Sequence, residues 1–276
     1  MIDLHLHTTA SDGRSTPDAL VREVQAAGIT TMALTDHDTV AGIAATAAAA
    51  SLAGVEFVAG IEITAVADSR DLHMLGYFID VTAPELGPFL TRQRAERRRR
   101  VLAIAARLDQ LGAPIDETTL LANADRQAGK SVGRPLVAAA LIEAGHATDV
   151  SDAFNRYLAE GRPAFIERAG APPADVIALI ARAGGLSSLA HPGKMGRDDI
   201  IPALIDAGLS AIEVYHPDHT ADDVRRYEAM ARGASLLITG GSDYHGPGSG
   251  RTAGLGTVGL PAGAYRELVA SRSAAG

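Results

Sequence analysis

The chain of 276 residues contains no cysteine and no tryptophan, and only 4% of its residues are aromatic. The absence of cysteine excludes disulfides and thiolate metal ligands, and it is compatible with the cytoplasm, where we expect the protein. The hydrophobic content is 47%, which is enough for a sizeable core. Because aromatic side chains are scarce, this core must consist mainly of alanine, leucine, isoleucine and valine.

Long apolar runs and positive charge are also lacking. No apolar stretch approaches the roughly 20 residues of a membrane span, so we expect no membrane association. The N-terminus enters a strand with Asp3 and His5 directly, so we expect no signal peptide. The formal net charge of −8 argues against a general surface for duplex DNA. It does not argue against a phosphorylated small molecule, because a local basic pocket can bind one in an acidic protein.

An alternation of short apolar strands and helices runs through most of the chain. The helix signals include Thr16-Pro17, an N-cap followed by proline at the first helical position. This alternation of strands and helices predicts an α/β fold with a parallel sheet or a barrel. The strands are expected at residues 2–5, 31–35, 56–64, 71–78, 186–190, 210–215 and 235–239.

The strand pattern stops between residues 84 and 170. This stretch has the periodicity of helices, with a long one at 85–111 and shorter ones near 135–144 and 150–159. We therefore expect two parts. Residues 1–83 and 171–276 would form the barrel, and residues 84–170 would be a helical insertion that caps the substrate site.

Histidines and carboxylates gather at the predicted strand ends. His5 and His7 lie at positions i and i+2 and therefore point to the same face of a strand. Catalytic residues of parallel α/β barrels collect at the carboxyl ends of strands. Imidazoles with carboxylates suit Zn, Mn, Fe or Mg, and so many ligands indicate more than one ion. The residues concerned are His5, His7, His37, His73, His191 and His245, with Asp12, Asp36, Asp38, Glu62 and Asp243 beside them.

Several of these residues lie in motifs that resemble a known family. The segments are DLHLHTTASDG from Asp3, ALTDHD from Ala33, GIEIT from Gly60, AHP from Ala190 and GSDYH from Gly241. They resemble the PHP (polymerase and histidinol phosphatase) family of metal-dependent phosphoesterases, which implies a distorted (β/α)7 barrel.

Two further motifs resemble a narrower branch of this family. They are GRP at residues 133–135 and EVYHPDH at residues 213–219. Members of this branch remove a phosphate from nucleoside 3′,5′-bisphosphates, and relatives trim short RNA from its 5′ end. The branch usually has histidine after GRP, whereas this chain has Leu136.

The resemblance implies two to three divalent ions. His5, His7, Glu62 and Asp243 would hold the first ion. Glu62, His73 and His191 would hold the second, and Asp12, His37 and His245 the third. Mn²⁺ is favoured, with Fe²⁺ or Zn²⁺ as alternatives, because Asp12 adds a carboxylate where some members have histidine.

The roles of single residues leave alternatives open. We expect Glu62, His191 and Asp243 to be catalytic. His73 lies within a strand and is alternatively a core histidine. Asp36 and Asp38 are expected to orient ligands or to shape turns. His216 and His219 either line the mouth of the site or form a surface turn.

Arginines of the helical part are candidates for binding a phosphate. Arg97 and Arg100 share a helix face with Ile104 and Leu108, so they should point inward. Arg134 lies in a glycine-bounded loop at a helix start, which is a good anion site, although a surface arginine is the alternative. Lys130 and Lys194 are weaker candidates.

We therefore expect a phosphohydrolase that removes the 3′-phosphate of nucleoside 3′,5′-bisphosphates to give 5′-monophosphates, with short oligoribonucleotides as further substrates. One alternative is a histidinol-phosphate-type phosphatase, which the arginines disfavour because its substrate carries an aminoalcohol cation. The other is a non-catalytic metal-binding module, which the complete ligand set disfavours. The native metal, the base preference and the oligomeric state stay open.

Overall fold

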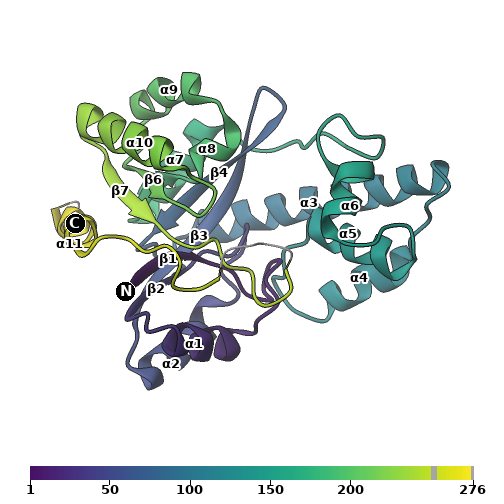
Figure 1. Ribbon diagram of the computed structural model, residues 1–276, viewed down its shortest axis with the longest axis horizontal. Coiled ribbons are helices and arrows are strands. Elements are labelled where there is room, and N and C mark those ends of the chain that lie inside the picture. The colour runs from purple at the N-terminus through teal and green to yellow at the C-terminus, as the bar shows by residue number, and fades with distance from the viewer. Residues whose placement is uncertain (250–253, 275–276) are drawn as a thin grey trace.

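The computed structural model describes residues 1–249 and 254–274. In this part of the chain seven strands form one curled sheet with helices around it, so the predicted α/β fold is confirmed (Figure 1). Each strand that we expected is present. The strands are β1 (Ile2–Leu6), β2 (Thr31–Leu34), β3 (Glu56–Ala67), β4 (Arg70–Tyr77), β5 (Leu186–Leu189), β6 (Ala211–Tyr215) and β7 (Leu237–Gly240).

The strands follow one another in chain order, but the sheet is not purely parallel. β4 is antiparallel to both β3 and β5, while the remaining neighbours are parallel. The expectation of a parallel sheet is wrong here because only Asp68 and Ser69 separate β3 from β4. Both have positive φ angles (49° and 63°), as in two-residue hairpin turns, and so short a connection cannot join parallel strands. Beyond β7, Tyr244 pairs with Leu6 of β1, which curls the sheet further.

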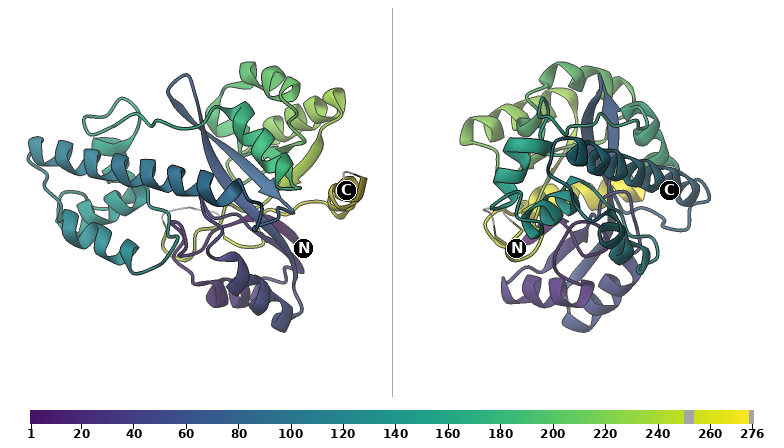
Figure 2. Two further views of the ribbon diagram at one scale, coloured as in Figure 1. Left: turned by 180° about the vertical axis from the view of Figure 1, so that it is seen from behind. Right: turned by 90° about the vertical axis from the view of Figure 1, so that its right-hand side faces the viewer.

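Helices cover the sheet on two sides and at one end. On one side lie α1 (Pro17–Ala26) and α2 (Ile43–Ala53) (Figures 1 and 2). As predicted, Thr16 caps α1 by accepting a hydrogen bond from the amide of Ala19. None of the helices in the described part of the chain has both the length and the apolar character of a membrane span. The other helices around the sheet are α7 (Pro173–Arg182), α8 (Pro192–Met195), α9 (Ile201–Asp206), α10 (Ala221–Ala234) and α11 (Ala262–Ala274).

The chain between β4 and β5 forms a group of helices beside the sheet, which we call the helical segment (residues 86–158; Figure 1). Its buried apolar side chains, among them Ile104, Leu108, Val137 and Leu141, form a core of their own. A division of the chain into domains at residues 84 and 170 stays a prediction. The helices are α3 (Leu86–Gln110), α4 (Glu117–Asp125), α5 (Arg134–Glu143), α6 (Val150–Ala153) and a π-helix (Phe154–Leu158).

Candidate metal centre

The nine predicted metal ligands gather at one end of the sheet. Glu62 lies within β3 and is fully buried, and ligands in or just after β1, β2, β4, β5 and β7 surround it. Most of the nine are buried, and only Asp12 and His73 are partly exposed. His5 lies in β1, His7 and Asp12 follow β1, His37 follows β2, His73 lies in β4, His191 follows β5, and Asp243 and His245 follow β7.

The first group consists of the four residues expected for the first ion. The Oε2 atom of Glu62 lies 3.2 Å from His7 Nε2 and 3.3 Å from His5 Nε2. The Oδ1 atom of Asp243 lies 3.3 Å and 3.4 Å from the same two nitrogens. Two imidazoles and two carboxylates thus converge on a common point.

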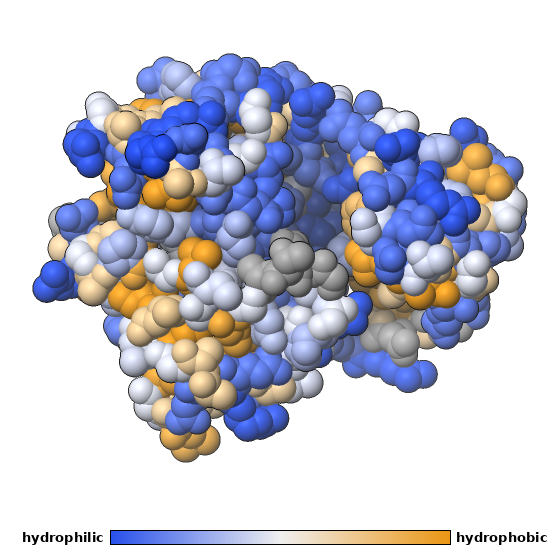
Figure 3. Space-filling model, in the orientation of Figure 1, coloured by the Kyte–Doolittle hydropathy of each residue, from blue (hydrophilic) through white to orange (hydrophobic). Residues whose placement is uncertain are grey.

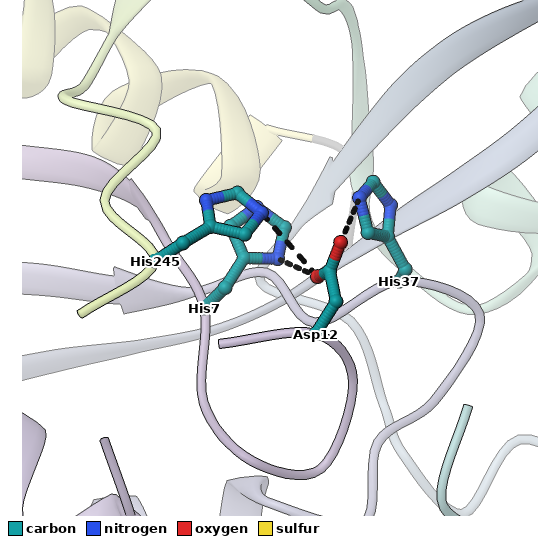
Figure 4. A group of neighbouring side chains, drawn as sticks. All are labelled: His7, Asp12, His37 and His245. Carbon is teal, nitrogen blue, oxygen red and sulfur yellow. Dashed lines mark ion pairs between the residues drawn. The ribbon is translucent and has the colours of Figure 1, made fainter. Parts of the chain in front are cut away.

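The second group has Asp12 between three imidazoles (Figure 4). Asp12 Oδ1 lies 3.3 Å from His245 Nε2 and 4.0 Å from His7 Nδ1, and Asp12 Oδ2 lies 3.8 Å from His37 Nε2. These are the three residues expected for the third ion, and the structure adds His7 to them.

The third group surrounds Glu62 and contacts both of its carboxylate oxygens. His73 Nδ1 is 2.7 Å and His191 Nε2 is 3.3 Å from Glu62 Oε1, and His37 Nδ1 is 3.1 Å from Oε2. His73 pairs with Thr64 across the β3–β4 ladder, so Glu62, two residues before Thr64, is its diagonal neighbour on the same face. The structure therefore places His73 in the cluster and not in the apolar core, whereas its neighbours Leu72 and Met74 belong to that core.

The unpaired atoms of this cluster are suited to cations. Within the described residues, both ring nitrogens of His7 and the Nδ1 atoms of His37 and His73 are buried without a hydrogen-bond partner. Each nonetheless lies close to a carboxylate oxygen. Buried polar atoms are normally hydrogen-bonded, so converging nitrogens that lack such bonds fit divalent ions held by imidazole and carboxylate.

The electrostatics of the centre also favour cations. Burial opposes the charge on Glu62, but His37, His73 and His5 hold the pKa of its carboxyl well below the usual range. Burial lowers the pKa of His191 to about 4, so its imidazole is neutral, which is the form that binds metals. Although burial opposes the charge on His7, the nearby carboxylates of Asp243 and Glu62 raise its pKa to about 9. A metal ion would replace that proton.

The loops that carry the ligands are fixed by short contacts. Asp36 accepts hydrogen bonds from the amide and hydroxyl of Thr8 and from the hydroxyl of Ser11, and so it shapes the loop before Asp12. This agrees with the role in turn formation that we expected for Asp36. Gly241 brings the end of β7 against β1, since a Cβ there would meet the Cβ of His5 at 2.6 Å.

Two cavities border the centre and share Lys194 and Asp243, and Figure 3 shows a hollow with hydrophilic surroundings between the sheet and the helical segment. The first cavity, of about 530 Å³, is lined by residues that include Asp12, His245, Lys130, Leu136 and Phe154. The second cavity, of about 340 Å³, is lined by residues that include Glu62, His73, His191, Arg134, Asp71 and Phe165.

Of the three arginines expected to bind substrate, Arg134 lines the second of these two cavities, whereas Arg97 and Arg100 line neither. Its Nη2 atom lies 3.3 Å from Asp71 Oδ2, and its guanidinium lies 5.8 Å from the ring centre of Phe165. Arg97 instead donates to Asp38 and Thr64, and Arg100 donates to Asp71 Oδ2 at 2.9 Å. The helical periodicity correctly placed Arg97 and Arg100 on an inward face, but it could not show that carboxylates occupy this face.

Arg168 and Asp71 are two functional candidates that the sequence analysis missed. Arg168 donates to Asp38 Oδ2 at 2.9 Å, its side chain is 3% exposed, and its Nε atom has no hydrogen-bond partner among the described residues. Arg134 belongs to the same group of buried arginines. Burial, and after it the positive charge of the neighbouring Arg100, lowers the pKa of Arg134 to about 10. No local motif surrounds Arg168, so only its distant partners could reveal it. Asp71 could have been noticed as the carboxylate two residues before His73.

Two lysines and His216, the next candidates, line the first cavity. The ammonium of Lys130 donates to the carbonyl of Thr9 at 2.7 Å, and that of Lys194 lies 3.0 Å from Asp218 Oδ2. His216 is buried with its Nε2 atom 3.4 Å from Asp243 Oδ2, so it is not part of a surface turn.

Comparisons with known proteins agree with this arrangement. The family described as the PHP domain matches residues 3–157. A 3′,5′-nucleoside bisphosphate phosphatase from Chromobacterium violaceum is 33% identical over 254 residues, which cover 90% of this chain and 88% of that protein. The 5′-3′ exoribonuclease Rnm from Escherichia coli is 34% identical over 253 residues, covering 89% and 85%. A crystal structure from Bifidobacterium adolescentis, assigned as a metal-dependent phosphoesterase, has a TM-score of 0.90 at 33% identity and covers 98% of this chain and 95% of its own.

Proposed function

The chain belongs to the PHP domain family, and on this basis we propose that it removes the 3′-phosphate of nucleoside 3′,5′-bisphosphates to give nucleoside 5′-monophosphates. Phosphoesterase activity is supported by the family match and by the similarity to the bisphosphate phosphatase and the exoribonuclease. The observation that carries the choice of substrate is Arg134, which lines the same cavity as Glu62, His73 and His191. A guanidinium there can hold a second phosphate beside the one that reacts.

The proposed ions would be held by the nine imidazole and carboxylate residues of the three groups. When bound, divalent ions supply an activated water and stabilise the charge that develops on the phosphate and the leaving oxygen. Glu62 would be central, because its two oxygens face ligands of both the first and the third group. Mn²⁺ is our proposed ion, with Fe²⁺ or Zn²⁺ as alternatives, because Asp12 contributes an oxygen to an otherwise imidazole-rich group.

The charge balance behind the second cavity supports a second phosphate. Within the described residues, Arg97, Arg100, Arg134 and Arg168 form ion pairs with two carboxylates, those of Asp38 and Asp71. Charges that are buried without a partner are costly, so this excess of two positive charges favours binding of an anion. A phosphate group that is not cleaved would carry the matching negative charge.

The helical segment would act as the cap of the substrate site. It supplies Arg134 to the second cavity, and Leu136 and Phe154 to the first. These apolar side chains offer a surface for the nucleoside. A cytoplasmic location remains part of this proposal.

Trimming of short RNA from its 5′ end is a second candidate. The two cavities meet at Asp243 and Lys194, so a nucleotide chain can extend on both sides of the metal centre. A small phosphomonoester substrate would need only one of these two cavities. The similarity to the exoribonuclease Rnm supports this candidate.

A substrate panel tests the proposal. Purified protein, loaded with Mn²⁺ and separately treated with EDTA, would be assayed on p-nitrophenyl phosphate, nucleoside 2′-, 3′- and 5′-monophosphates, nucleoside 3′,5′-bisphosphates, histidinol phosphate and short RNA. We expect the highest kcat/KM for a 3′,5′-bisphosphate, with release of the 3′-phosphate and loss of activity in EDTA. A preference for histidinol phosphate, or activity unaffected by EDTA, would refute the proposal.

A further inference from the structure

We propose that Glu213 of β6 is a positioning residue that holds two of the candidate ligands, His5 and His191, with its two carboxylate oxygens. The inference rests on the proposed metal centre. Glu213 is fully buried. Its Oε1 atom lies 2.8 Å from His5 Nδ1, and its Oε2 atom accepts a hydrogen bond of 2.7 Å from the amide of His191. β6 supplies none of the nine predicted ligands, so its contribution to the centre is this carboxylate.

The contact with His5 determines which ring nitrogen faces the other ligands. An ionised carboxylate can only accept, so Nδ1 of His5 must carry the hydrogen. Nε2 is then the ring nitrogen left to bind a metal ion, and it faces Glu62 Oε2 and Asp243 Oδ1, which lie 3.3 Å and 3.4 Å away. A histidine that ligates a metal usually donates its other ring hydrogen to a carboxylate or carbonyl, which fixes its tautomer and orientation.

The contact with His191 stabilises an unfavourable backbone conformation. His191 has φ 32° and ψ 56°, in the left-handed region, although it is not a glycine and precedes Pro192. Such a conformation is unfavourable for a residue with a side chain, and more so before proline, and it persists only where surrounding contacts hold it. The hydrogen bond from the His191 amide to Glu213 is one such contact, and it lies next to the side chain that faces Glu62.

A second contact from the same region holds the same turn. The amide of Gly193 donates to His219 Nε2 at 3.1 Å, and His219 Nδ1 donates to the carbonyl of Val214 at 2.8 Å. Glu213, Val214 and His219 therefore act together on the turn that presents His191. The EVYHPDH segment thus has a physical role in this chain that does not require its histidines to contact substrate.

Glu213→Gln is the variant that separates positioning from packing. It keeps the size of the side chain, but its single amide oxygen can accept from only one of the two donors, and its amide nitrogen would face the other N–H. We expect the affinity of the metal-free protein for Mn²⁺, measured by isothermal titration calorimetry, to fall about tenfold to a hundredfold. The ¹⁵N NMR signals of the His5 ring should also show a changed tautomer.

The matched control is Glu228→Gln, because Glu228 accepts a hydrogen bond from Tyr215 of β6 outside the metal centre. This variant should bind Mn²⁺ as the wild type does. Wild-type affinity in Glu213→Gln, with an unchanged His5 tautomer, would overturn the inference. An equal loss in both variants would also overturn it, because the effect would then come from disturbance of β6. Failure of the proposed function is distinguishable, because it would appear in the substrate panel on the wild type, whereas this test compares the Mn²⁺ affinities of the two variants with that of the wild type.

Discussion

The end of the sheet that carries the nine predicted metal ligands (the metal end) and the helical segment hold their charged side chains in different ways. At the strand ends, imidazoles and carboxylates converge and leave ring nitrogens such as those of His7 without hydrogen bonds. In the helical segment, Arg97 and Arg100 are instead paired with carboxylates of the sheet region. Residues 84–170 contain 13 Lys and Arg against 11 Asp and Glu, whereas the rest of the chain contains 12 against 22. One region is therefore suited to cations and the other to an anion, and the second cavity lies between them.

The difference teaches that a charged residue on an inward face is not by itself a ligand for substrate. Asp38 and Asp71 belong to the sheet region, yet each of them binds arginines that come from beyond β4. Arg97, Arg100 and Arg134 of the helical segment thus connect the two regions, and Arg134 also lines the second cavity.

The largest effect should follow from removing the carboxylate at the middle of the metal end. Glu62→Ala should lower kcat/KM about a thousandfold or more and reduce the amount of bound metal, because several kcal/mol of charge stabilisation depend on the ions that Glu62 would hold. The measurements are steady-state kinetics on p-nitrophenyl phosphate and metal analysis of the purified protein.

Glu62→Gln serves as a second variant that keeps the side-chain volume, and Asp206→Ala, at an exposed position, serves as a control. The control should retain full activity. Near wild-type turnover in both Glu62 variants would show that the metal end does not depend on this carboxylate, and the contrast between the two regions would fail.

The next largest effect concerns the connection between the regions. Asp38→Asn should destabilise the protein by about 3–5 kcal/mol, because it leaves the guanidiniums of Arg97 and Arg168 buried without a carboxylate. Asparagine tolerates the positive φ of 50° at this position, so the backbone is kept. Urea unfolding of the metal-free protein measures the change. A loss below about 1 kcal/mol would mean that the arginines find other partners.

The metal end could be predicted from the sequence because local order determines it. His5 and His7 share a face through strand periodicity, and ligands that follow strands meet at one edge of a sheet. The prediction of the metal site did not depend on the direction of β4. We expected a parallel sheet, but β4 is antiparallel to β3. The hairpin at Asp68 and Ser69 brings His73 to Glu62 by cross-strand pairing.

The partners of the arginines could not be predicted, because they are far away in the chain. Arg168 lies 130 residues from Asp38. The helical pattern of α3 indicated which arginines point inward, but it carried no information on whether a carboxylate or a cavity lies opposite. Glu213 was likewise invisible as a contact of His5, from which 208 residues separate it.

A smaller effect should follow from removing the arginine that lines the second cavity. Arg134→Ala should lower kcat/KM for a 3′,5′-bisphosphate about tenfold to a hundredfold, because a charge-assisted contact with phosphate contributes roughly 1.5–3 kcal/mol. Hydrolysis of p-nitrophenyl phosphate should barely change, since this substrate has no second phosphate. Michaelis curves for both substrates on wild type and variant provide the comparison.

The relation between the two losses decides the role of Arg134. Equal losses on both substrates would mean that Arg134 supports the reaction or the fold. No loss on either would mean that the positive charge at the cavity wall does not bind substrate, and the helical segment would lose its proposed role as an anion site.

The smallest effect is expected for Arg98, which lies next to Arg97 in the chain but on the outside of α3. Its guanidinium lies 2.6 Å and 3.2 Å from the oxygens of Asp125, and the two side chains are 43% and 58% exposed. An exposed pair of this kind contributes about 1 kcal/mol or less, because water and salt screen the charges and both side chains lose conformational freedom. The free energy of unfolding of Arg98→Ala should therefore lie within about 1 kcal/mol of the wild-type value, and this variant should hydrolyse both substrates at wild-type rates. Arg97→Ala should be clearly less stable, because Asp38, the partner of Arg97, is fully buried. Urea unfolding and kinetics on the two variants side by side test this. Similar losses in both would mean that burial does not distinguish neighbouring arginines of this run, and that the helix contributes as a basic surface and not through individual pairs.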